Sequence, residues 1–363
     1  MLHVRGLTVG YGGTPVLDGV DLEIQKGQFA SLIGPSGSGK TSVLRVVTEL
    51  ISAEHGSVEL DVPMRDVAFL FQDDALLPWR TVRQNVALGL HIRELPEATV
   101  ADKAEHWLTV LGLAGLGDRY PAQLSGGQRK RAAIAQVLAL EPKLLLLDEP
   151  FASLDLALRR KLLPFLRRLR TEFHIPMLFV SHDPIEVQAV CDDLIVLKDG
   201  GIIAQGEPRQ VLTETHIFPL AEQEGFENIL PCHLVEGNGS TSRVRLGEEA
   251  GDQACTVELV TLGSEAEPGD AMLAGIPAND IMLATKRPEG LSARNVLPAR
   301  ITELRSVGSV DLVTAEISPD VPPLTVEVTE KSFVELGLQV GGEVFLVIKA
   351  TSCRLYESGL SAL

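Results

Sequence analysis

The residues best suited to chemistry in this sequence lie in a glycine-rich stretch, Gly34–Thr41, which reads GPSGSGKT. Glycines let a backbone approach an anion closely, so that its N–H groups and the start of a following helix can point at phosphate oxygens. The Lys40 amine would reach the β- and γ-phosphates of a nucleotide, and the Thr41 hydroxyl would bind Mg²⁺. The stretch therefore predicts a phosphate-binding loop between a strand and a helix.

Two adjacent carboxylates, Asp148 and Glu149, follow the apolar run Leu144–Leu147. At the end of a buried strand, Asp148 would hold Mg²⁺ through water, and Glu149 would polarise the water that attacks phosphorus. Taken alone, two such acids could merely cap the next helix. In a chain that also carries a phosphate-binding loop, they favour a hydrolytic site.

The elements that must position these residues follow from the hydrophobic pattern. Phe29–Ile33, Leu144–Leu147 and Met177–Val180 are short, almost wholly apolar runs, as expected of parallel strands buried on both faces. Stretches between them, such as Arg129–Leu140, carry apolar residues at helical spacing. Alternating strands and helices predict an α/β domain over residues 1–225.

The remaining residues have a different pattern. From about Asn228, short β-branched segments alternate with Gly and Pro, which predicts an all-β domain over residues 226–363. Two segments begin alike, Asn228-Ile-Leu-Pro and Asn295-Val-Leu-Pro, as in a tandem repeat of barrel halves. Two domains also suit the length, because 363 residues exceed what one hydrophobic core usually organises.

Charge and composition exclude several classes of function. The net charge is −17, and acids outnumber Lys and Arg by 29 to 22 in residues 1–225 and by 20 to 10 afterwards, which argues against a nucleic-acid partner. The four cysteines are scattered without a CxxC pair, so we expect reduced, buried thiols. No run of roughly 18 apolar residues and no secretory segment occurs, so we expect a soluble protein that reaches the membrane only through a partner.

A third motif, Leu124–Gln128, reads LSGGQ and opens a predicted helix. Ser125 suits an N-cap, and Gly126 and Gly127 expose backbone donors at the positive end of the helix. With the phosphate-binding loop and the acidic pair, this motif resembles the diagnostic signature of the ATP-binding-cassette family. The resemblance covers roughly residues 1–225 and implies an ATPase that uses ATP and Mg²⁺.

The resemblance assigns roles to further residues. Gln72 matches the glutamine that senses the γ-phosphate and Mg²⁺, and His182 matches the switch histidine that contacts the γ-phosphate. Tyr11 matches the aromatic residue that stacks on adenine, although it could also be a turn tyrosine. The implied catalytic residues are Glu149, His182 and Gln72; the metal ligands are Thr41, Gln72 and Asp148; and the ATP-binding residues are Tyr11, Gly34, Pro35, Ser36, Gly37, Ser38, Gly39, Lys40, Thr41 and Ser42.

A homodimer is also implied. In the family, the signature motif of one subunit covers the γ-phosphate bound by the other, so a monomer has incomplete sites. Catalysis would then consist mainly of positioning and charge neutralisation. Asp155 matches the loop that crosses the dimer interface. The residues expected to reach the partner's ATP are Ser125, Gly126, Gly127 and Gln128.

An apolar segment that includes Leu76, Leu77 and Trp79 suggests a groove for a partner helix. In related importers this region receives a helix of the membrane permease, although these residues could also pack under the helical part of the domain. The resemblance thus implies a peripheral protein on the cytoplasmic face of the inner or plasma membrane, served indirectly by a periplasmic or lipid-anchored solute-binding protein. The basic run Arg129-Lys130-Arg131 is interpreted as a solvated helix face.

The segments 287–298 and 347–352 resemble the two ends of a molbindin-like (TOBE) domain over about residues 290–356. That fold is a small oligonucleotide/oligosaccharide-type (OB-type) barrel found in molybdate importer ATPases. Donors and positive charge suited to a bound tetrahedral oxyanion such as molybdate come from Ser292, Arg294, Lys349 and Ser352. The same side chains could instead be local salt-bridge partners.

The sequence therefore predicts a P-loop ATP-binding-cassette domain of the α/β class, residues 1–225, followed by an all-β OB-type barrel domain, residues 226–363. We expect an ATP-hydrolysing subunit of an importer, with molybdate as the first choice of cargo. Importers of ferric iron, sulfate, sulfonate or nitrate, or polyamine remain alternatives, as does a molybdate storage or sensor protein. A DNA-repair or ribosome-associated ATPase is disfavoured, because only about fifty residues separate Gln72 from Leu124 and a second cassette is absent.

Overall fold

The computed structural model describes residues 1–12, 14–152, 154, 159, 163, 166–167, 174–214, 216–218, 226–237, 239–247, 257–264, 266–308 and 310–356. The chain divides into two compact units. The first comprises the described residues of Met1–His182 and Val190–Val211, and the second those of Asp183–Ala189 and Leu212–Glu357. The domain boundary predicted between residues 225 and 226 stays a prediction.

The centre of the first unit is a six-stranded sheet with the order β5-β6-β7-β3-β8-β9. Adjacent strands run parallel except at β8 and β9, which are antiparallel. Every residue of β3, β6 and β7 is buried, as their apolar runs predict. The strands are β3 (Phe29–Ile33), β5 (Val67–Leu70), β6 (Leu144–Asp148), β7 (Met177–Val180), β8 (Asp193–Lys198) and β9 (Gly201–Gly206).

A second, antiparallel sheet has the order β2-β1-β4, with β1 (Leu2–Tyr11), β2 (Thr14–Ile24) and β4 (His55–Leu60). The helix α1 (Lys40–Val47) follows β3. Buried side chains of this sheet, of α1 and of β3, β6, β7 and β8 form one hydrophobic cluster. The end of β3 and the start of α1 are therefore anchored in the core, which leaves the intervening loop in a fixed place.

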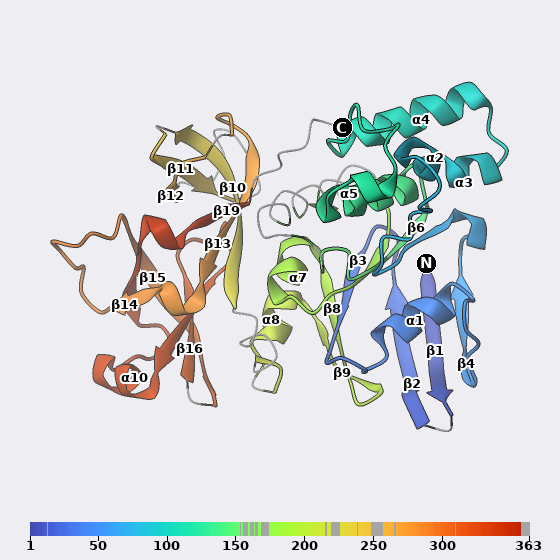
Figure 1. Ribbon diagram of the computed structural model, residues 1–363. Helices are drawn as coiled ribbons and strands as arrows, with labels where there is room; N and C mark the ends of the chain where they lie inside the picture. The colour runs from blue at the N-terminus through green and yellow to red at the C-terminus, as the bar shows by residue number, and fades with distance from the viewer. Residues whose placement is uncertain are drawn as a thin grey trace. The chain divides into compact units, whose positions relative to one another are not determined.

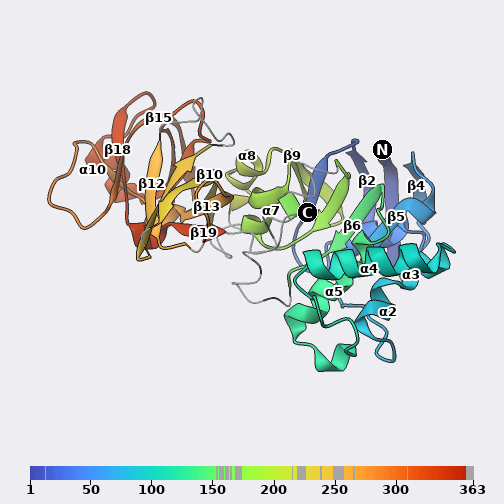
Figure 2. The same ribbon diagram turned by 90° about the horizontal axis from the view of Figure 1, so that it is seen from above.

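Four helices form a separate lobe beside the β5 and β6 side of the large sheet (Figures 1 and 2). They are α2 (Val82–Val86), α3 (Leu88–Ile92), α4 (Glu97–Val110) and α5 (Gly126–Leu138). Short 3-10 turns precede β5 at Met64–Asp66 and α5 at Pro121–Gln123. Two further helices follow along the chain: α7 (Pro184–Val190), almost all of which belongs to the second unit, and α8 (Pro208–Leu212), almost all of which belongs to the first. The described residues contain no helix long and apolar enough to cross a membrane.

The second unit holds two five-stranded antiparallel sheets with the orders β12-β11-β10-β13-β19 and β17-β16-β15-β18-β14. Both sheets contribute to one hydrophobic cluster. The first half of the unit consists of β10 (Glu227–Gly237), β11 (Thr241–Leu246), β12 (Glu258–Leu262), β13 (Ala271–Pro277), a 3-10 turn (Ala278–Asp280) and β14 (Met282–Ala284). The second half consists of β15 (Asn295–Val307), β16 (Val310–Glu316), β17 (Leu324–Thr329), α10 (Glu330–Leu336), β18 (Glu343–Ile348), a 3-10 turn (Ala350–Ser352) and β19 (Arg354–Tyr356).

These orders confirm the predicted tandem repeat and add a strand exchange. Each half supplies four strands to its own sheet, and its fifth strand, β14 or β19, joins the sheet of the other half. The two repeated asparagines occupy matching places. Asn228 bonds both the N–H and the C=O of Thr325, and Asn295 does the same with Val260. Each therefore joins its own sheet to the edge strand of the other.

The fold class predicted from the sequence, an α/β domain followed by a β-rich domain, is confirmed. The expected burial is confirmed for Cys191, Cys232 and Cys353, which form no disulfide among the described residues. Cys255 lies outside the described residues.

Candidate functional site

The glycine-rich loop joins β3 to α1, as its sequence predicts. Gly34 has φ 155° and Gly39 has φ 99°, a conformation that side-chain-bearing residues rarely adopt. A Cβ at Gly34 would overlap the carbonyl oxygen of Leu197, and one at Gly39 would overlap the side chain of Leu17. Backbone conformation and space therefore both require glycine at these two positions, because the loop passes close to β8 at Gly34 and to β2 at Gly39.

The Lys40 side chain turns back over this loop. Its Nζ donates to the carbonyl oxygens of Gly34 at 2.7 Å and Pro35 at 3.0 Å. Burial lowers the pKa of the Lys40 amine, and the carboxylates of Glu149 and Asp148 oppose that shift. The Ser38 hydroxyl is buried and has no hydrogen-bond partner within the described ranges. The Ser38 hydroxyl and the Lys40 amine, whose protonated form the two carboxylates favour, can both donate hydrogen bonds. These two donors in one loop fit the phosphates of ATP.

Thr41 and Asp148 lie together although 107 positions separate them in sequence. The Thr41 hydroxyl donates to Asp148 Oδ1 at 3.1 Å. Burial raises the pKa of the Asp148 carboxyl, the Thr41 hydrogen bond lowers it, and the neighbouring Glu149 charge raises it. A hydroxyl and a carboxylate beside a phosphate loop are oxygen ligands of the kind that Mg²⁺ prefers, so the predicted ligand pair fits the ion.

The three predicted catalytic side chains meet at the carboxyl ends of adjacent parallel strands. Gln72 follows β5, Glu149 follows β6 and His182 follows β7. Gln72 Nε2 donates to Glu149 Oε2 at 3.3 Å, and His182 Nδ1 lies 3.7 Å from the same oxygen. Glu149 has a positive φ of 44°, and its N–H donates to the Val180 carbonyl of the neighbouring strand at 2.9 Å. The hydrogen bond to Val180 holds the strained backbone of Glu149 in place. In this conformation the Glu149 carboxylate lies beside Gln72 and His182.

Tyr11 and Ser42 lie beside the start of α1. The Tyr11 hydroxyl and the Ser42 hydroxyl are 3.5 Å apart, while the tyrosine residue is 51% exposed. An exposed ring at this place has the freedom to stack on a base, and that role stays a prediction.

The signature residues open α5. The Ser125 hydroxyl accepts from the Gln128 N–H at 3.2 Å, and Gln128 Oε1 accepts from the Ser125 N–H at 3.0 Å, which forms a capping box. Gly126 and Gly127 are the first two residues of the helix. In the part of the chain that is described, no hydrogen bond or ion pair joins these four residues to the phosphate loop.

Comparison with known proteins agrees with this geometry. A family model described as ABC transporter matches residues 17–152, and one described as TOBE domain matches residues 291–355. The sulfate/thiosulfate import ATP-binding protein CysA of Halalkalibacterium halodurans is 33% identical over 358 residues, which cover 95% of this chain and 96% of that protein. Its namesake from Bordetella parapertussis is 37% identical over 352 residues, covering 94% and 95%. The chain belongs to the ATP-binding-cassette family.

Solved cassettes share the fold of the first unit. The dimeric structure of MJ0796, a bacterial ABC transporter cassette, has 30% identity and a TM-score of 0.54, and covers 58% of this chain and 99% of its own. A post-hydrolysis dimer of the same cassette bound to ADP and Pi has the same coverage and a TM-score of 0.53. The present chain is thus an ABC transporter ATPase with a C-terminal TOBE domain.

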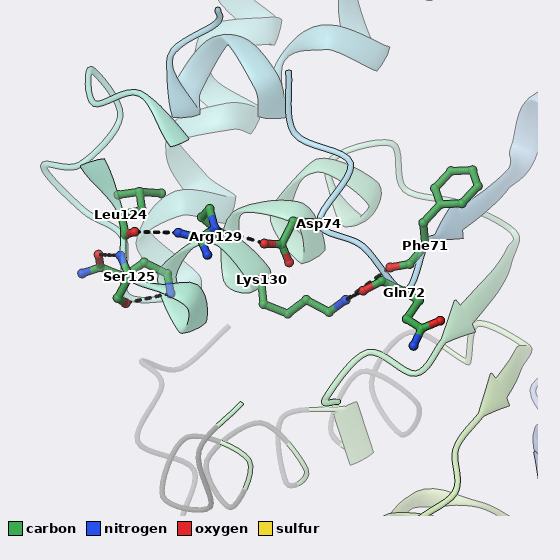
Figure 3. A network of polar contacts seen from close by, with 8 residues as sticks. Phe71, Gln72, Asp74, Leu124, Ser125, Arg129 and Lys130 are labelled. Atoms are coloured by element: carbon green, nitrogen blue, oxygen red, sulfur yellow. Dashed lines mark hydrogen bonds and ion pairs between the residues drawn. The ribbon is translucent and has the colours of Figure 1, made fainter. Parts of the chain in front are cut away.

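The interpretation of Arg129-Lys130-Arg131 as a solvated face of this ATPase's signature helix is wrong. Lys130 is 1% exposed, and its Nζ donates to the carbonyl oxygens of Gln72 at 2.8 Å and Phe71 at 3.2 Å (Figure 3). Burial lowers the pKa of the Lys130 amine, and nearby carboxylates, that of Asp74 foremost, oppose the shift. Carbonyl groups at the end of β5 need donors, and the long lysine stem reaches them through the packed interior.

The side chains of Arg129 and Arg131 also form hydrogen bonds within the domain. Arg129 donates to the Leu124 carbonyl at 2.9 Å and forms an ion pair with Asp74 at 3.3 Å, and Arg131 donates to the Leu111 carbonyl at 2.9 Å. One pattern in the sequence does indicate that Lys130 is buried. Lys130 is followed at helical spacing by three buried apolar residues of α5, so it lies on the buried face. Those residues are Ala133, Ile134 and Val137.

The predicted partner segment is exposed only in part. Trp79 is 70% exposed, whereas Leu76 and Leu77 are half-buried. Behind them, the buried Asn85 accepts from the Leu77 N–H at 2.7 Å and donates to the carbonyl oxygens of Leu77, Arg80 and Thr81 at 3.0 to 3.1 Å. This asparagine holds the loop that presents the Trp79 ring. Asp155, the predicted interface residue, lies outside the described residues.

Two of the predicted oxyanion residues, Arg294 and Lys349, lie at one end of a sheet in the second unit. Arg294 directly precedes β15, Lys349 directly follows β18, and these strands pair with Asn295 opposite Ile348. Ser292, Arg294 and Lys349 are exposed, and Ser352 is half-buried. Neither cation forms a salt bridge within the described part of the chain, which does not support the salt-bridge alternative. Their role in binding an anion stays a prediction.

Proposed function

We propose that this chain hydrolyses ATP to drive import of sulfate or a closely related tetrahedral oxyanion, thiosulfate included. ATP hydrolysis is supported by one observation: Gln72, Glu149 and His182 lie in contact beside the phosphate loop. The cargo is supported by the relatives that match almost the whole chain, because they are named for sulfate/thiosulfate import. Sulfate, an alternative in the sequence analysis, is therefore preferred over molybdate, the first choice there.

The residues divide the work of hydrolysis among them. The loop amides and the Lys40 amine bind the phosphates, while Thr41, Asp148 and Gln72 would hold Mg²⁺, which neutralises charge on the phosphate oxygens. Gln72 and His182 both contact Glu149 Oε2. We assign the other carboxylate oxygen of Glu149 to the attacking water, because Oε2 is already engaged. Positioning and electrostatics suffice, and no covalent intermediate is needed.

The active form is proposed to be a homodimer on the cytoplasmic face of the membrane. Support comes from the dimeric state named for both solved cassettes and from the signature residues that cap the start of α5. Membrane permease subunits would dock near the exposed Trp79. A periplasmic or lipid-anchored solute-binding protein would deliver the oxyanion to those subunits.

Uptake by a strain deleted for this gene tests the proposal. Complementation with the full chain should restore entry of labelled sulfate, and competition with thiosulfate, molybdate and ferric iron identifies the cargo. Glu149→Gln and Lys40→Ala should each abolish both ATP hydrolysis by the purified chain and uptake. Restored uptake of molybdate but not of sulfate would contradict sulfate as the cargo. Normal ATP hydrolysis by Glu149→Gln would contradict the catalytic role assigned to Glu149. Molybdate retention independent of Glu149 would favour the storage or sensor alternative.

A further inference from the structure

The helix α5 contacts the loop after β5 through two adjacent cations (Figure 3). Lys130 donates to the carbonyl oxygens of Phe71 and Gln72, and Arg129 pairs with the Asp74 carboxylate. Arg129 also donates to the Leu124 carbonyl, directly before the signature serine. The loop that carries Gln72 and the loop that carries the signature motif are thus fastened to the same turn of one helix.

The backbone of Gln72 is more firmly held than its side chain. Lys130 Nζ lies 2.8 Å from the Gln72 carbonyl oxygen, while the exposed side chain reaches Glu149 Oε2 at 3.3 Å. A long, exposed side-chain contact depends on the backbone from which it extends, because a shift of the loop by one ångström would break it. A group that fixes the carbonyl oxygen therefore also fixes where the Gln72 amide can reach.

We propose that Lys130 is a positioning residue for hydrolysis, which holds Gln72 against Glu149 and fastens its loop to the signature helix. The proposal rests on the proposed ATPase function. Lys130 does not touch the reacting atoms and acts only through Gln72. Because Ser125–Gln128 open the same helix, a nucleotide bound near Gln72 is joined through α5 to the residues expected to reach the partner's nucleotide.

The burial of an ammonium group supports a specific role for Lys130. A charged group taken out of water costs free energy unless hydrogen bonds replace its hydration, whereas an apolar side chain of similar length would fill the same space without that cost. Here two carbonyl oxygens supply the replacement, and the carboxylate of Asp74 opposes the burial-induced fall in the pKa of the Lys130 amine. Arg131 gives a matched comparison, since it donates to Leu111 and Gly112 and not to the Gln72 loop.

The experiment compares Lys130→Met, Lys130→Arg and Arg131→Met in the purified full chain. We expect Lys130→Met to lower kcat about tenfold, while KM for ATP and the affinity for a fluorescent ATP analogue change by less than about twofold. Lys130→Arg should recover at least half of the lost rate, because a guanidinium still donates to the carbonyl oxygens. Gln72→Ala combined with Lys130→Met should be no slower than Gln72→Ala alone, since both remove the same contact.

Several outcomes would overturn the assignment. A kcat unchanged in Lys130→Met would do so, as would rate losses that multiply in the double variant. Equal losses of kcat and of melting temperature in Lys130→Met and Arg131→Met would show a merely structural role. A separate control tests the ATPase function itself. If the chain is not an ATPase, the unmodified protein will show no ATP hydrolysis that depends on Glu149.

Discussion

Replacing Asn228 by Ala gives a sharp test of how the two sheets of the second unit are joined. Asn228 is fully buried, and its Nδ2 donates to the carbonyl oxygens of Thr325 at 2.8 Å and Ile276 at 3.1 Å. Its Oδ1 accepts from the Thr325 N–H at 2.7 Å. Thr325 lies on β17, an edge strand of its sheet, so its outward main-chain groups have no strand beside them among the described residues.

The magnitude follows from the groups that the substitution leaves unpaired. Each buried donor or acceptor without a partner costs about 1–3 kcal/mol, and Asn228→Ala removes the partners of both main-chain groups of Thr325. The third bond, to Ile276, adds a smaller amount, and water entering the vacated space offsets part of the total. We therefore expect a loss of about 3–5 kcal/mol in the free energy of unfolding, a large share of the roughly 5–15 kcal/mol typical of a domain.

Urea denaturation of the full chain, followed by circular dichroism and by fluorescence, measures this loss. Asn295→Ala should cost a similar amount, because Asn295 makes the matching pair of bonds to Val260 at 2.7 and 2.9 Å. The control is Asn279→Ala, at an exposed position of the intervening 3-10 turn, and it should change stability by less than about 0.5 kcal/mol. Losses below about 1 kcal/mol in both buried variants would refute the conclusion that these asparagines bridge the sheets.

Three further outcomes are expected. Gly39→Ala should weaken binding of a fluorescent ATP analogue at least about tenfold, because φ is 99° and a Cβ would overlap Leu17; unchanged affinity would contradict the loop geometry. Burial raises the pKa of the Asp193 carboxyl, so its ionised form destabilises the native state as pH rises. Asp193→Asn should raise the melting temperature at pH 7, and the gain should shrink as pH falls towards the ordinary value of 3.8; a gain independent of pH would refute this cause. Trp79→Ala should lower uptake more than basal ATP hydrolysis, because the exposed ring is proposed to contact the permease; equal losses of uptake and hydrolysis would contradict that role.

Sequence reasoning identified the parts of the site whose chemistry depends on neighbours along the chain. The loop Gly34–Thr41 needs glycines, a lysine and a hydroxyl within eight positions, and the acidic pair needs a buried strand directly before it. Such demands are local, so they are visible as motifs. The meeting of Gln72, Glu149 and His182 is a different case. The family resemblance pointed to it, and the order β5-β6-β7 brings it about.

Tertiary structure alone decided which charges face water and which strands exchange. Arg129, Lys130 and Arg131 are consecutive cations, and their composition favours a solvated face; the carbonyl groups that bind them come from segments up to 59 positions away. Likewise, the Asn-Ile/Val-Leu-Pro repeat indicated two similar halves but not that β14 and β19 change places. Residue types determine the cost of burying a side chain. Hydrogen bonds can offset this free-energy cost, but only the folded chain brings the hydrogen-bond partners within reach of the buried group.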